Sequence, residues 1–591
     1  MRNMHIENYP RPQLVRPEWT NLNGEWDFAF DRRDVGKAEK WNVHFPQSQK
    51  IVVPFTYETK LSGIGIEKDV NVVWYHRKLP VSRKDLSNER LILHMEGCDY
   101  YSEIYVNGVM TGSHTGAYSR ASYDITDALD DNENYLTVRI EDSRDKSQPR
   151  GKQRWLDDNY GCWYVQTTGI WKTVWLEKVP SVYIQALRLT PSAKKCCIDF
   201  DMEVNQLPAD NEKYVAQFRI MDGEKEINTV SLALEQKKVS GRCFLYGSEL
   251  HNWGIKLWSP EHPNLYDIEV TLVRDEQAVD KVYSYFGLRD ICCSKGQILL
   301  NGVPLYERLI LDQGYWKDSG LTPPSEEALI EDIDKTLALG YNGVRKHQKV
   351  EDERYLYWAD VKGLLVWSEV GAFYDFTEKS ITDFTQQWIE IVRENYNHPC
   401  IITWTPFNES WGIRQVKTNR QEQEFTEGIY YLTKSLDSTR PVIANDGWEH
   451  TISDIITIHD YAEDGDEFYR HYMNHIQEIL KNERFPSREK AAFADGYEYK
   501  GQPIMITEYG GIAFQTDKGW GYGNQVSDEK EFLNRFKNIT EAIKRIPWCC
   551  GYCYTQLTDV QQEVNGLLSE NRAYKVSPDK VKAINEIPAG E

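Results

Sequence analysis

Short segments that alternate apolar and polar side chains dominate the first half of the chain. Residues 22–30 contain such an alternation, and residues 102–108 carry a similar segment into an Asn-Gly turn. Alternation with a period of two indicates strands with one buried face, and Asn-Gly is typical of a tight turn between antiparallel strands. We therefore predict an antiparallel β-sandwich over residues 1–179. A second set of short strands over residues 180–287 predicts an immunoglobulin-like β-sandwich.

The pattern changes in the second half, where apolar strands alternate with helical segments. Leu329, Ile333 and Leu337 recur every four residues, as on one face of a helix, and Gly340 is expected to end that helix. Eight strands are predicted, at residues 305–311, 343–346, 364–369, 401–408, 442–445, 455–460, 504–508 and 550–554. Eight strands separated mostly by helices indicate a (β/α)8 barrel over residues 288–591, with its functional site at the carboxyl ends of the strands.

Two of the predicted barrel strands run into a glutamate. Residues 401–412 read Ile-Ile-Thr-Trp-Thr-Pro-Phe-Asn-Glu-Ser-Trp-Gly, and residues 503–511 read Pro-Ile-Met-Ile-Thr-Glu-Tyr-Gly-Gly. A single glutamate at a strand end is usually a solvated loop residue. On a barrel, however, Glu409 would follow the fourth strand and Glu508 would end the seventh, so both would face the same mouth. Two such carboxylates are the minimum equipment for hydrolysing a glycosidic bond.

Both glutamate motifs resemble those of glycoside hydrolase family 2, the family of β-galactosidases, β-glucuronidases and β-mannosidases. Asn-Glu-Ser-Trp-Gly at 408–412 is similar to the acid/base motif of the family, and Thr-Glu-Tyr-Gly at 507–510 is similar to its nucleophile motif. The resemblance extends to Gly-Ile-Trp at 169–171 and to residues 257–266. It implies a jelly-roll, sugar-binding-like first domain, an immunoglobulin-like second domain and a catalytic barrel.

The resemblance assigns Glu508 as the nucleophile and Glu409 as the acid/base of a retaining glycosidase. This chemistry requires an ionised Glu508 and a Glu409 that holds a proton near neutral pH. The candidate substrate-binding residues are Asn408, Arg345, Lys346, Gln348, Lys349, Tyr461, Trp367, Trp163 and Tyr554. We expect Arg345 to keep the nucleophile charged, Asn408 to donate to the 2-hydroxyl of the sugar and Tyr461 to reach the nucleophile. Ordinary roles, such as a surface ion pair or a core tryptophan, remain open.

Departures from the family pattern bear on the substrate. Trp163 stands where galactosidases and glucuronidases carry an aspartate that touches the sugar, and Glu-Val-Asn at 563–565 replaces the Asn-x-Lys with which glucuronidases hold the sugar carboxylate. Lys346 and Lys349 place extra cations after the second strand, which favours a β-D-hexuronide such as a β-D-galacturonide. The alternatives are a β-galactosidase, with these lysines directed away from the pocket, a non-catalytic carbohydrate-binding protein and a transglycosylase.

Composition narrows the partners of this 591-residue chain. A net charge of −22 without a long basic run argues against nucleic acid as a partner. The sequence has no run of about 20 consecutive apolar residues, so we do not expect a membrane-spanning segment. The first ten residues lack the apolar core of a signal peptide, and the eleven cysteines include adjacent pairs, so we predict a cytoplasmic protein with reduced thiols. The expected partners are small glycosides or oligosaccharides. No metal or organic cofactor is expected, and a homo-oligomer remains open.

Overall fold

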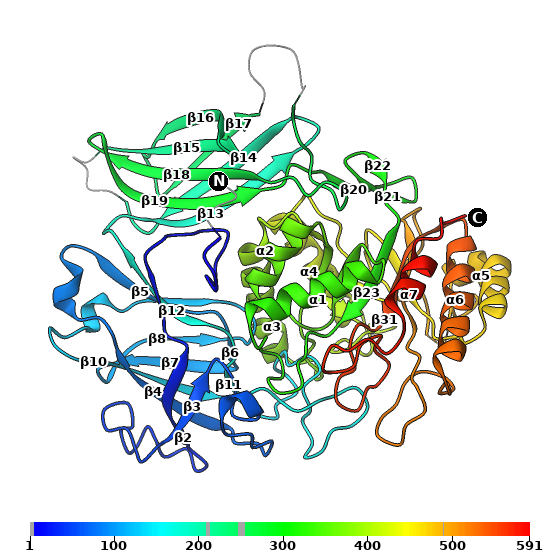
Figure 1. Cartoon of the computed structure of the whole chain (residues 1–591), viewed down its shortest axis with the longest axis horizontal. Coiled ribbons are helices and arrows are strands. Elements are labelled where there is room, and N and C mark those ends of the chain that lie inside the picture. Colours follow the sequence, from blue (N-terminus) through cyan, green and yellow to red (C-terminus); the bar gives the residue numbers. More distant parts are fainter. Residues whose placement is uncertain (1–4, 208–212, 246–253, 488–489, 591) are drawn as a thin grey trace.

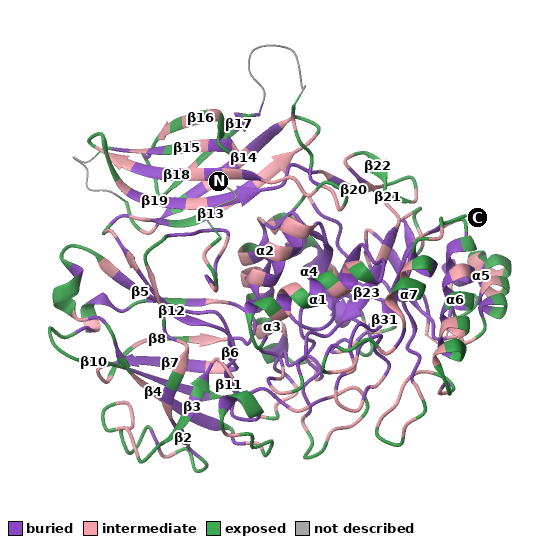
Figure 2. Cartoon of the chain, in the orientation of Figure 1, coloured by how far each residue is buried: buried purple, intermediate pink, exposed green. Residues whose placement is uncertain are grey.

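Three units packed against one another make up the protein (Figure 1). The computed structural model describes residues 5–207, 213–245, 254–487 and 490–590. Figure 2 shows that buried residues follow the strands of all three units. The outer limits predicted for the first and last domains, residues 1 and 591, lie outside the described residues. The first four residues, which entered the signal-peptide prediction, also lie outside them.

The first unit is a sandwich of antiparallel sheets. One sheet has the strand order β1-β12-β5-β9, the other has the order β3-β2-β4-β10-β7-β8, and β11 pairs with β6. Asn107 and Gly108 both have positive φ values and form the predicted two-residue turn between β7 and β8. The elements are β1 Trp19–Asn21, β2 Gly24–Phe30, β3 Gln49–Val53, η1 Lys60–Ser62, β4 Val72–Leu79, η2 Arg83–Leu86, β5 Arg90–Met95, β6 Cys98–Asp99, β7 Tyr101–Val106, β8 Val109–Thr115, β9 Ala121–Asp124, η3 Thr126–Ala128, β10 Asn134–Glu141, β11 Gly169–Ile170 and β12 Val174–Val179.

The second unit consists of two further antiparallel sheets, with the orders β13-β14-β17 and β16-β15-β18-β19. Phe200 on one sheet stacks on Phe218 on the other, with 3.9 Å between ring centroids, so the core lies between the sheets. The predicted β-sandwich is present. Its strands are β13 Ile184–Ser192, β14 Cys197–Val204, β15 Tyr214–Asp222, β16 Lys225–Ala233, β17 Lys238–Phe244, β18 Tyr266–Arg274 and β19 Gln277–Phe286.

The third unit is built around a curled parallel sheet with the order β26-β25-β24-β23-β31-β30-β29. The fifth predicted strand is reduced to an isolated bridge at Val442 and to the two-residue β28, which pairs with β27. The strands are β20 Ile291–Ser294, β21 Gln297–Leu300, β22 Val303–Pro304, β23 Glu307–Asp312, β24 Gly343–Lys346, β25 Leu365–Glu369, β26 Ile401–Thr405, β27 Phe407–Asn408, β28 Asn445–Asp446, β29 Ile456–His459, β30 Ile504–Gly510 and β31 Cys549–Thr555.

Helices cover the outside of the parallel sheet. Ser325 caps the first of them by accepting a hydrogen bond from the backbone of Ala328, and Gly340, with φ of 83°, follows its end as predicted. The helices are α1 Glu326–Ala338, α2 Glu353–Lys362, α3 Glu378–Asn395, α4 Arg420–Leu436, α5 Gly465–Leu480, α6 Glu529–Arg545 and α7 Pro578–Asn585. Of the helices in the described part of the chain, none combines the length and apolar character needed to cross a bilayer.

A long segment between β10 and β11, residues 142–168, joins the first unit to the barrel. In Figure 1 this cyan segment extends toward the loops of the barrel. The hydroxyl of Tyr374 donates to the carbonyl of Gly151 at 2.6 Å, and the amide of Asn159 donates to the side chain of Gln561 at 2.6 Å. The first unit therefore supplies residues to the edge of the barrel at which the strands end.

Candidate active site

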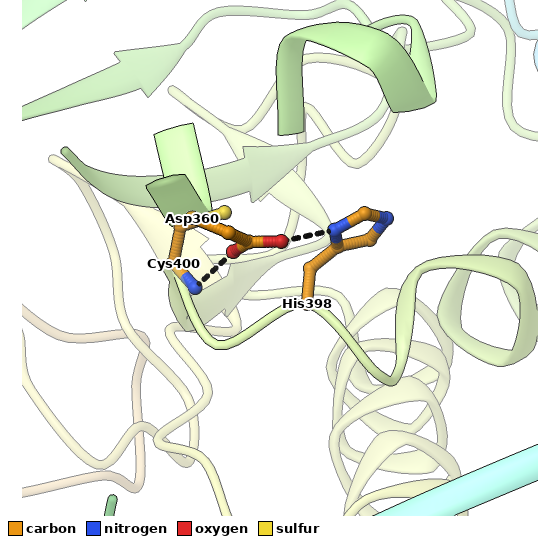
Figure 3. Close-up of side chains that lie close together, drawn as sticks. All are labelled: Asp360, His398 and Cys400. Atoms are coloured by element: carbon orange, nitrogen blue, oxygen red, sulfur yellow. Dashed lines mark hydrogen bonds and ion pairs between the residues drawn. The ribbon is translucent and has the colours of Figure 1, made fainter. Parts of the chain in front are cut away.

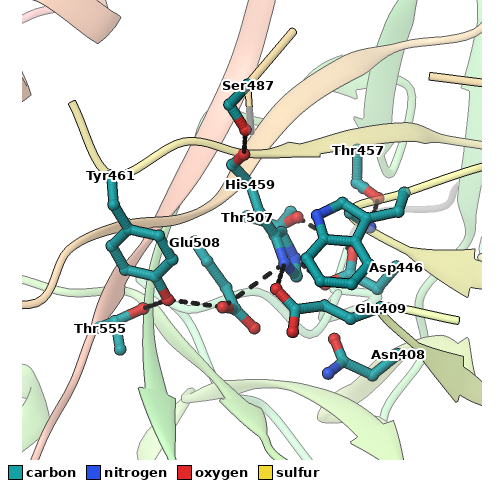
Figure 4. A network of polar contacts seen from close by, with 12 residues as sticks. Asn408, Glu409, Asp446, Thr457, His459, Tyr461, Ser487, Thr507, Glu508 and Thr555 are labelled. Atoms are coloured by element: carbon teal, nitrogen blue, oxygen red, sulfur yellow. Dashed lines mark hydrogen bonds and ion pairs between the residues drawn. The ribbon is translucent and has the colours of Figure 1, made fainter. Parts of the chain in front are cut away.

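Glu409 and Glu508 face each other at the carboxyl ends of their strands (Figure 4). Glu409 directly follows β27, and Glu508 lies in β30. A carboxylate oxygen of one lies within 4.8 Å of a carboxylate oxygen of the other. Retaining glycosidases hold their two carboxyl groups about 5 to 5.5 Å apart, whereas inverting enzymes need about 6.5 to 9.5 Å to admit a water molecule. The spacing here fits the retaining geometry.

The backbone at the first glutamate is held in an unusual conformation. Glu409 has φ of 49° and Ser410 has φ of 56°, in the left-handed region that costs a non-glycine residue about 1 to 3 kcal/mol. Three hydrogen bonds hold this turn: Glu409 N to Asp446 O at 2.9 Å, Ser410 N to Asn445 Oδ1 at 3.0 Å, and Ser410 Oγ to Glu449 Oε2 at 2.7 Å. The turn directs the carboxylate of Glu409 into the mouth of the barrel.

Arg345 and Tyr461 fix the carboxylate of Glu508. Arg345 Nη1 lies 2.9 Å from Glu508 Oε1, and the hydroxyl of Tyr461 donates to Oε2 at 2.5 Å. Arg345 also pairs with Glu369 at 2.9 Å and with Asp446 at 2.7 Å, and its side chain is fully buried. The sequence therefore placed both Arg345 and Tyr461 correctly beside the second glutamate.

Asn408 has one hydrogen-bonding atom engaged and one available. Arg345 Nη2 donates to Asn408 Oδ1 at 2.5 Å, which defines the orientation of the amide. The other amide atom, Nδ2, is a buried donor that has no hydrogen-bond acceptor within the described structure. A buried donor without an acceptor is rare in folded proteins and points to a ligand or water. Asn408 is thus prepared to donate to a substrate oxygen.

His459 lies between the two glutamates at the end of β29. Its Nδ1 is 2.8 Å from Glu409 Oε1 and 3.4 Å from Glu508 Oε2, and its Nε2 is 2.9 Å from Asp446 Oδ2. Burial lowers the pKa of His459, but the nearby carboxylates outweigh burial and raise it to about 10. The ring is therefore a cation at neutral pH. A Cβ atom on Gly447 would lie 2.4 Å from this ring, so only glycine fits there.

The proton that we expected on Glu409 from the sequence lies on His459 instead. Burial raises the pKa of Glu409, but the hydrogen bond and charge of His459 outweigh burial and lower it. The prediction that Glu409 itself holds a proton near neutral pH is therefore wrong for the free protein. Glu409 and His459 share one proton across 2.8 Å, and the proton resides on Nδ1 of the histidine.

Family models account for all three units. Models for glycosyl hydrolases family 2 match residues 19–180 as the sugar binding domain, residues 182–289 as the central domain and residues 291–536 as the TIM barrel domain. The chain belongs to glycosyl hydrolase family 2. This confirms both the resemblance read from the two glutamate motifs and the predicted fold class.

Named relatives and solved structures in the family agree with this architecture. A putative β-glucuronidase of Formosa agariphila is 28% identical over 384 residues, covering 62% of this chain and 44% of that protein. The chain spans about half the length of the curated relatives it matches first. It has the fold of a Bifidobacterium dentium β-glucuronidase complexed with coumarin-3-O-glucuronide, with a TM-score of 0.80 at 20% identity, covering 98% of this chain and 99% of that one.

A second solved structure with the same fold is a family 2 β-galacturonidase from Eisenbergiella tayi bound to galacturonate. The TM-score is 0.74 at 21% identity, and the match covers 98% of this chain and 99% of that chain. At such low identity the two structures establish the fold of this chain, and the residues of the site must be judged from its own geometry.

Lys346 and Lys349 do not face the two glutamates. Lys346 follows Arg345 on β24, so the pleat of the strand turns it to the opposite face. There its Nζ pairs with Asp312 at 2.5 Å and with Glu351 at 2.6 Å. Lys349 Nζ pairs with the same Glu351 at 3.1 Å. The prediction that these two lysines bind substrate is corrected: both are neutralised in a buried ion-pair cluster.

Trp367 and Tyr554 are also core residues rather than substrate contacts. Trp367 is fully buried two residues before the end of β25, where its Nε1 donates to Glu307 Oε2 at 2.8 Å. It is the register partner of Arg345 on β24, and its indole is directed toward Glu307 at the start of β23. Tyr554 packs edge-on against Phe536 of α6, with 5.1 Å between ring centroids. The alternation of β31 directs Tyr554 outward, so both predictions are corrected.

Gln348 and Trp163 do reach the surroundings of the site. The backbone amide of Gln348 donates to Glu369 Oε1 at 3.0 Å, which places this residue beside the partner of Arg345. Trp163, from the first unit, packs edge-to-face on Trp411, with 5.2 Å between ring centroids. Trp411 stands two residues after Glu409. The first unit therefore borders the site through a tryptophan.

Asp446 is a site residue that the sequence did not reveal. Its fully buried carboxylate pairs with both Arg345 and His459, and it accepts a hydrogen bond from Thr507 at 3.0 Å. Burial raises the pKa of Asp446, but Arg345 and His459 outweigh burial and lower it. Its position at the end of the fifth predicted strand was the available signal, because the site of a barrel lies at strand ends.

Two groups within the described residues each bring three potential metal ligands within 4.8 Å of one another: Asp360, His398 and Cys400 in one, and Glu409, His459 and Glu508 in the other. In the first, shown in Figure 3, Asp360 already accepts from His398 at 2.6 Å and from the backbone of Cys400 at 2.8 Å. Burial raises the pKa of the Cys400 thiol, which disfavours the thiolate a metal needs. In the second group both nitrogens of His459 are engaged and protonated. In both groups, contacts within the protein already engage the carboxylates and the histidine nitrogens that face them.

Proposed function

We propose that the protein is a retaining exo-β-glycosidase that hydrolyses terminal β-linked sugars through a covalent glycosyl-enzyme. The observation that carries this proposal is the separation of Glu409 and Glu508, whose oxygens approach within 4.8 Å. Glu508 is the nucleophile in this proposal, because Arg345 and Tyr461 hold its two oxygens toward the mouth. Glu409 is the acid/base. The same organised pair argues against the alternative of a binding protein without catalytic activity.

The first chemical step breaks the glycosidic bond. Glu508 attacks the anomeric carbon and forms an ester, while the leaving oxygen takes a proton from Glu409. Glu409 receives this proton from His459 Nδ1, 2.8 Å away, as it passes it on, so the pair delivers one proton and Glu409 remains a carboxylate that can act as the base in the second step. Nδ2 of Asn408 donates to the 2-hydroxyl, a contact that strengthens in the transition state. In the second step Glu409 takes a proton from water, the hydroxide attacks the anomeric carbon, and the carboxylate of Glu508 is released.

The first unit supports action on a terminal sugar. Gly151 and Trp163 of segment 142–168 lie against the loops at the mouth, so a second domain walls the barrel beside the carboxylates. Such a wall leaves room for the terminal sugar of an oligosaccharide but not for a sugar in its interior. The prediction of a hexuronide substrate has lost its original support, because Lys346 and Lys349 are paired elsewhere. A neutral β-D-galactoside remains the alternative substrate, because the two glutamates can cleave it by the same two steps as a hexuronide.

Covalent labelling tests the proposal directly. A 2-deoxy-2-fluoro glycoside with a dinitrophenyl leaving group should add its sugar mass to the peptide that contains Glu508. Fluorine slows both the formation and the hydrolysis of the ester, whereas the good leaving group accelerates only its formation, so the ester accumulates. Both the galactoside and the galacturonide reagents should be tried, with peptide mapping by mass spectrometry. The Glu508→Gln variant is the control that should remain unlabelled. Labelling of Glu409, or of no residue, would contradict the proposed nucleophile.

The pH dependence of catalysis should report the proton shared by Glu409 and His459. The raised pKa of His459 keeps the pair protonated up to about pH 10 and leaves it without a proton above that value. The alkaline limb of kcat/KM should therefore lie near pH 10 in the wild type. In His459→Gln the limb should move several pH units toward neutrality, because Glu409 then titrates alone.

The matched control for this measurement is His450→Gln. Burial lowers the pKa of His450 to about 4, so this histidine is neutral throughout the alkaline range. Its variant should keep the alkaline limb of the wild type. An alkaline limb that stays near pH 10 in His459→Gln would show that the histidine does not hold the catalytic proton.

A further inference from the structure

Lys152 is a buried cation at the barrel mouth that lacks a carboxylate partner. Its residue is 8% exposed, and its Nζ donates to Cys162 Sγ at 3.1 Å. Within the described residues, no carboxylate oxygen lies within the 4.0 Å of an ion pair from this Nζ. Lys346, by comparison, has two carboxylates within 2.6 Å. An ammonium has three donors and a thiol is a weak acceptor, so two donors of Lys152 have no acceptor among the residues that the structure describes.

The backbone around Lys152 is fixed against the barrel. The carbonyl of Lys152 accepts from the backbone of Tyr164 at 2.8 Å, and the preceding Gly151 donates to the carbonyl of Ala372 at 3.0 Å. A Cβ atom on Gly151 would lie 2.7 Å from the carbonyl oxygen of Gln348, so the segment lies directly on the end of β24. The lysine is therefore placed by two domains together and is not a mobile surface cation.

The charge of Lys152 acts on residues of the site. Burial lowers the pKa of Lys152, but Cys162, Glu563, Tyr374 and Glu409 outweigh burial and raise it, so the side chain is charged. Lys152 in turn contributes to the lowered pKa of Glu409. The catalytic acid/base and this lysine therefore share one electrostatic environment.

Lys152 acts electrostatically on a residue beside Glu508 as well as on Glu409. Its charge lowers the pKa of His347, after burial the largest contribution to that shift. His347 is 3.1 Å from Arg345 and 3.0 Å from Glu369, so it belongs to the ring of residues around the carboxylate of Glu508. That ring surrounds the sugar that Glu508 attacks.

We infer that Lys152 binds a carboxylate group on the terminal sugar and thereby makes the site selective for β-D-hexuronides. This inference rests on the proposed glycosidase function and names its substrate class. A carboxylate at C6 would supply the charged acceptor that Lys152 lacks, through a charge-assisted hydrogen bond that a hydroxymethyl group cannot match. With a neutral sugar the ammonium would keep only Glu409 and Glu563, which act on it from beyond ion-pair distance. The selectivity for uronides thus comes from the first domain and not from the lysines after β24.

Substitution of Lys152 tests the inference on four substrates: the p-nitrophenyl β-D-galacturonide, β-D-glucuronide and β-D-galactoside, and a β-D-galactoside with a carboxylated coumarin as leaving group. The wild type should prefer a uronide. Lys152→Met should lower kcat/KM for that uronide about 30- to 1,000-fold, because one partner of a buried charge pair is removed. The neutral galactoside should lose much less than the uronide, because only the effect of Lys152 on the pKa of Glu409 is removed for it. Lys152→Arg should recover part of the uronide activity.

Lys146→Met is the matched control. Lys146 belongs to the same segment, but its Nζ pairs with Asp375 at 3.0 Å and its side chain is 41% exposed. It should keep the wild-type ratio of uronide to galactoside. Equal loss on uronide and galactoside in Lys152→Met, or no loss on the uronide, would overturn the inference. A loss confined to the galactoside with the carboxylated leaving group would overturn the assignment to the sugar.

A binding measurement separates this inference from the proposed function. D-galacturonate, D-glucuronate and D-galactose are titrated calorimetrically into Glu508→Gln, with and without Lys152→Met. A uronate should bind more tightly than galactose, and the difference should vanish without Lys152. Equal binding of all three sugars in the presence of Lys152 would overturn the inference. Failure of the proposed function would instead appear as a wild type that cleaves no glycoside and takes no label on Glu508.

Discussion

Replacing Glu508 by glutamine should reduce kcat on every cleaved glycoside by at least about 10⁴-fold, the scale on which loss of a nucleophile acts in covalent catalysis. The glutamine amide keeps the size of the side chain and can still contact Arg345 and Tyr461. It cannot form the ester with the anomeric carbon. The measurement is kcat with dinitrophenyl glycosides, whose good leaving group makes the nucleophile the limiting requirement.

Glu307→Gln provides the isosteric control for this substitution. Glu307 lies deeper in the barrel, and burial raises its pKa to about 8, so it is largely protonated at neutral pH and glutamine resembles its native form. The control should retain activity and folding. A Glu508→Gln variant that is folded, as shown by circular dichroism, and keeps more than about a tenth of the wild-type kcat would remove Glu508 from the nucleophile role.

The sequence predicted the two glutamates and their surroundings because strand ends are encoded locally. A short apolar strand followed by a polar residue places that residue at the mouth of a barrel, whatever the helices between the strands contain. This reasoning placed Glu409, Glu508 and Arg345 together, and their contacts follow it. The same reasoning applies to His459, which ends β29 in the same way.

Two of the errors, at Lys346 and Tyr554, came from neglecting the alternation of side chains along a strand. Arg345 points into the barrel, so Lys346 must point outward, and Tyr554 must face the helices when Thr555 contacts Tyr461. A count of positive charges after β24 ignored this alternation and assigned Lys346 to the substrate. The period of two that identified the strands was sufficient to exclude it.

Lys152 could not be found by this local reasoning. It lies in an irregular segment of the first domain, and its proximity to Glu409 depends on how that domain packs on the barrel. The contacts that place it join residues more than two hundred positions apart, such as Gly151 and Tyr374. Neither strand periodicity nor motif spacing carries such information, so the structure was needed to move the expected cation from β24 to another domain.

Replacing Glu409 by alanine should slow formation of the glycosyl-enzyme only when the leaving group needs a proton, and should slow its hydrolysis with every substrate. With a poor leaving group kcat/KM should fall about 10²- to 10⁴-fold, because the departing oxygen receives no proton. With a dinitrophenyl leaving group the glycosyl-enzyme should still form, since that group leaves without protonation. It should then accumulate, because no base activates the water. Rapid release of about one equivalent of dinitrophenol followed by a slow steady state would reveal this accumulation.

Azide should restore turnover of Glu409→Ala, and the configuration of the product provides the sharpest check of both assignments. Azide is already an anion and needs no general base, so it should attack the ester on Glu508 from the face vacated by Glu409 and give a β-glycosyl azide. In Glu508→Ala, azide can attack the substrate only from the face of the missing nucleophile and should give an α-glycosyl azide. Proton NMR distinguishes the two anomers. An α-azide from Glu409→Ala, or no acceleration by azide, would contradict the role given to Glu409 and would leave its hydrogen bond to His459 without a catalytic purpose.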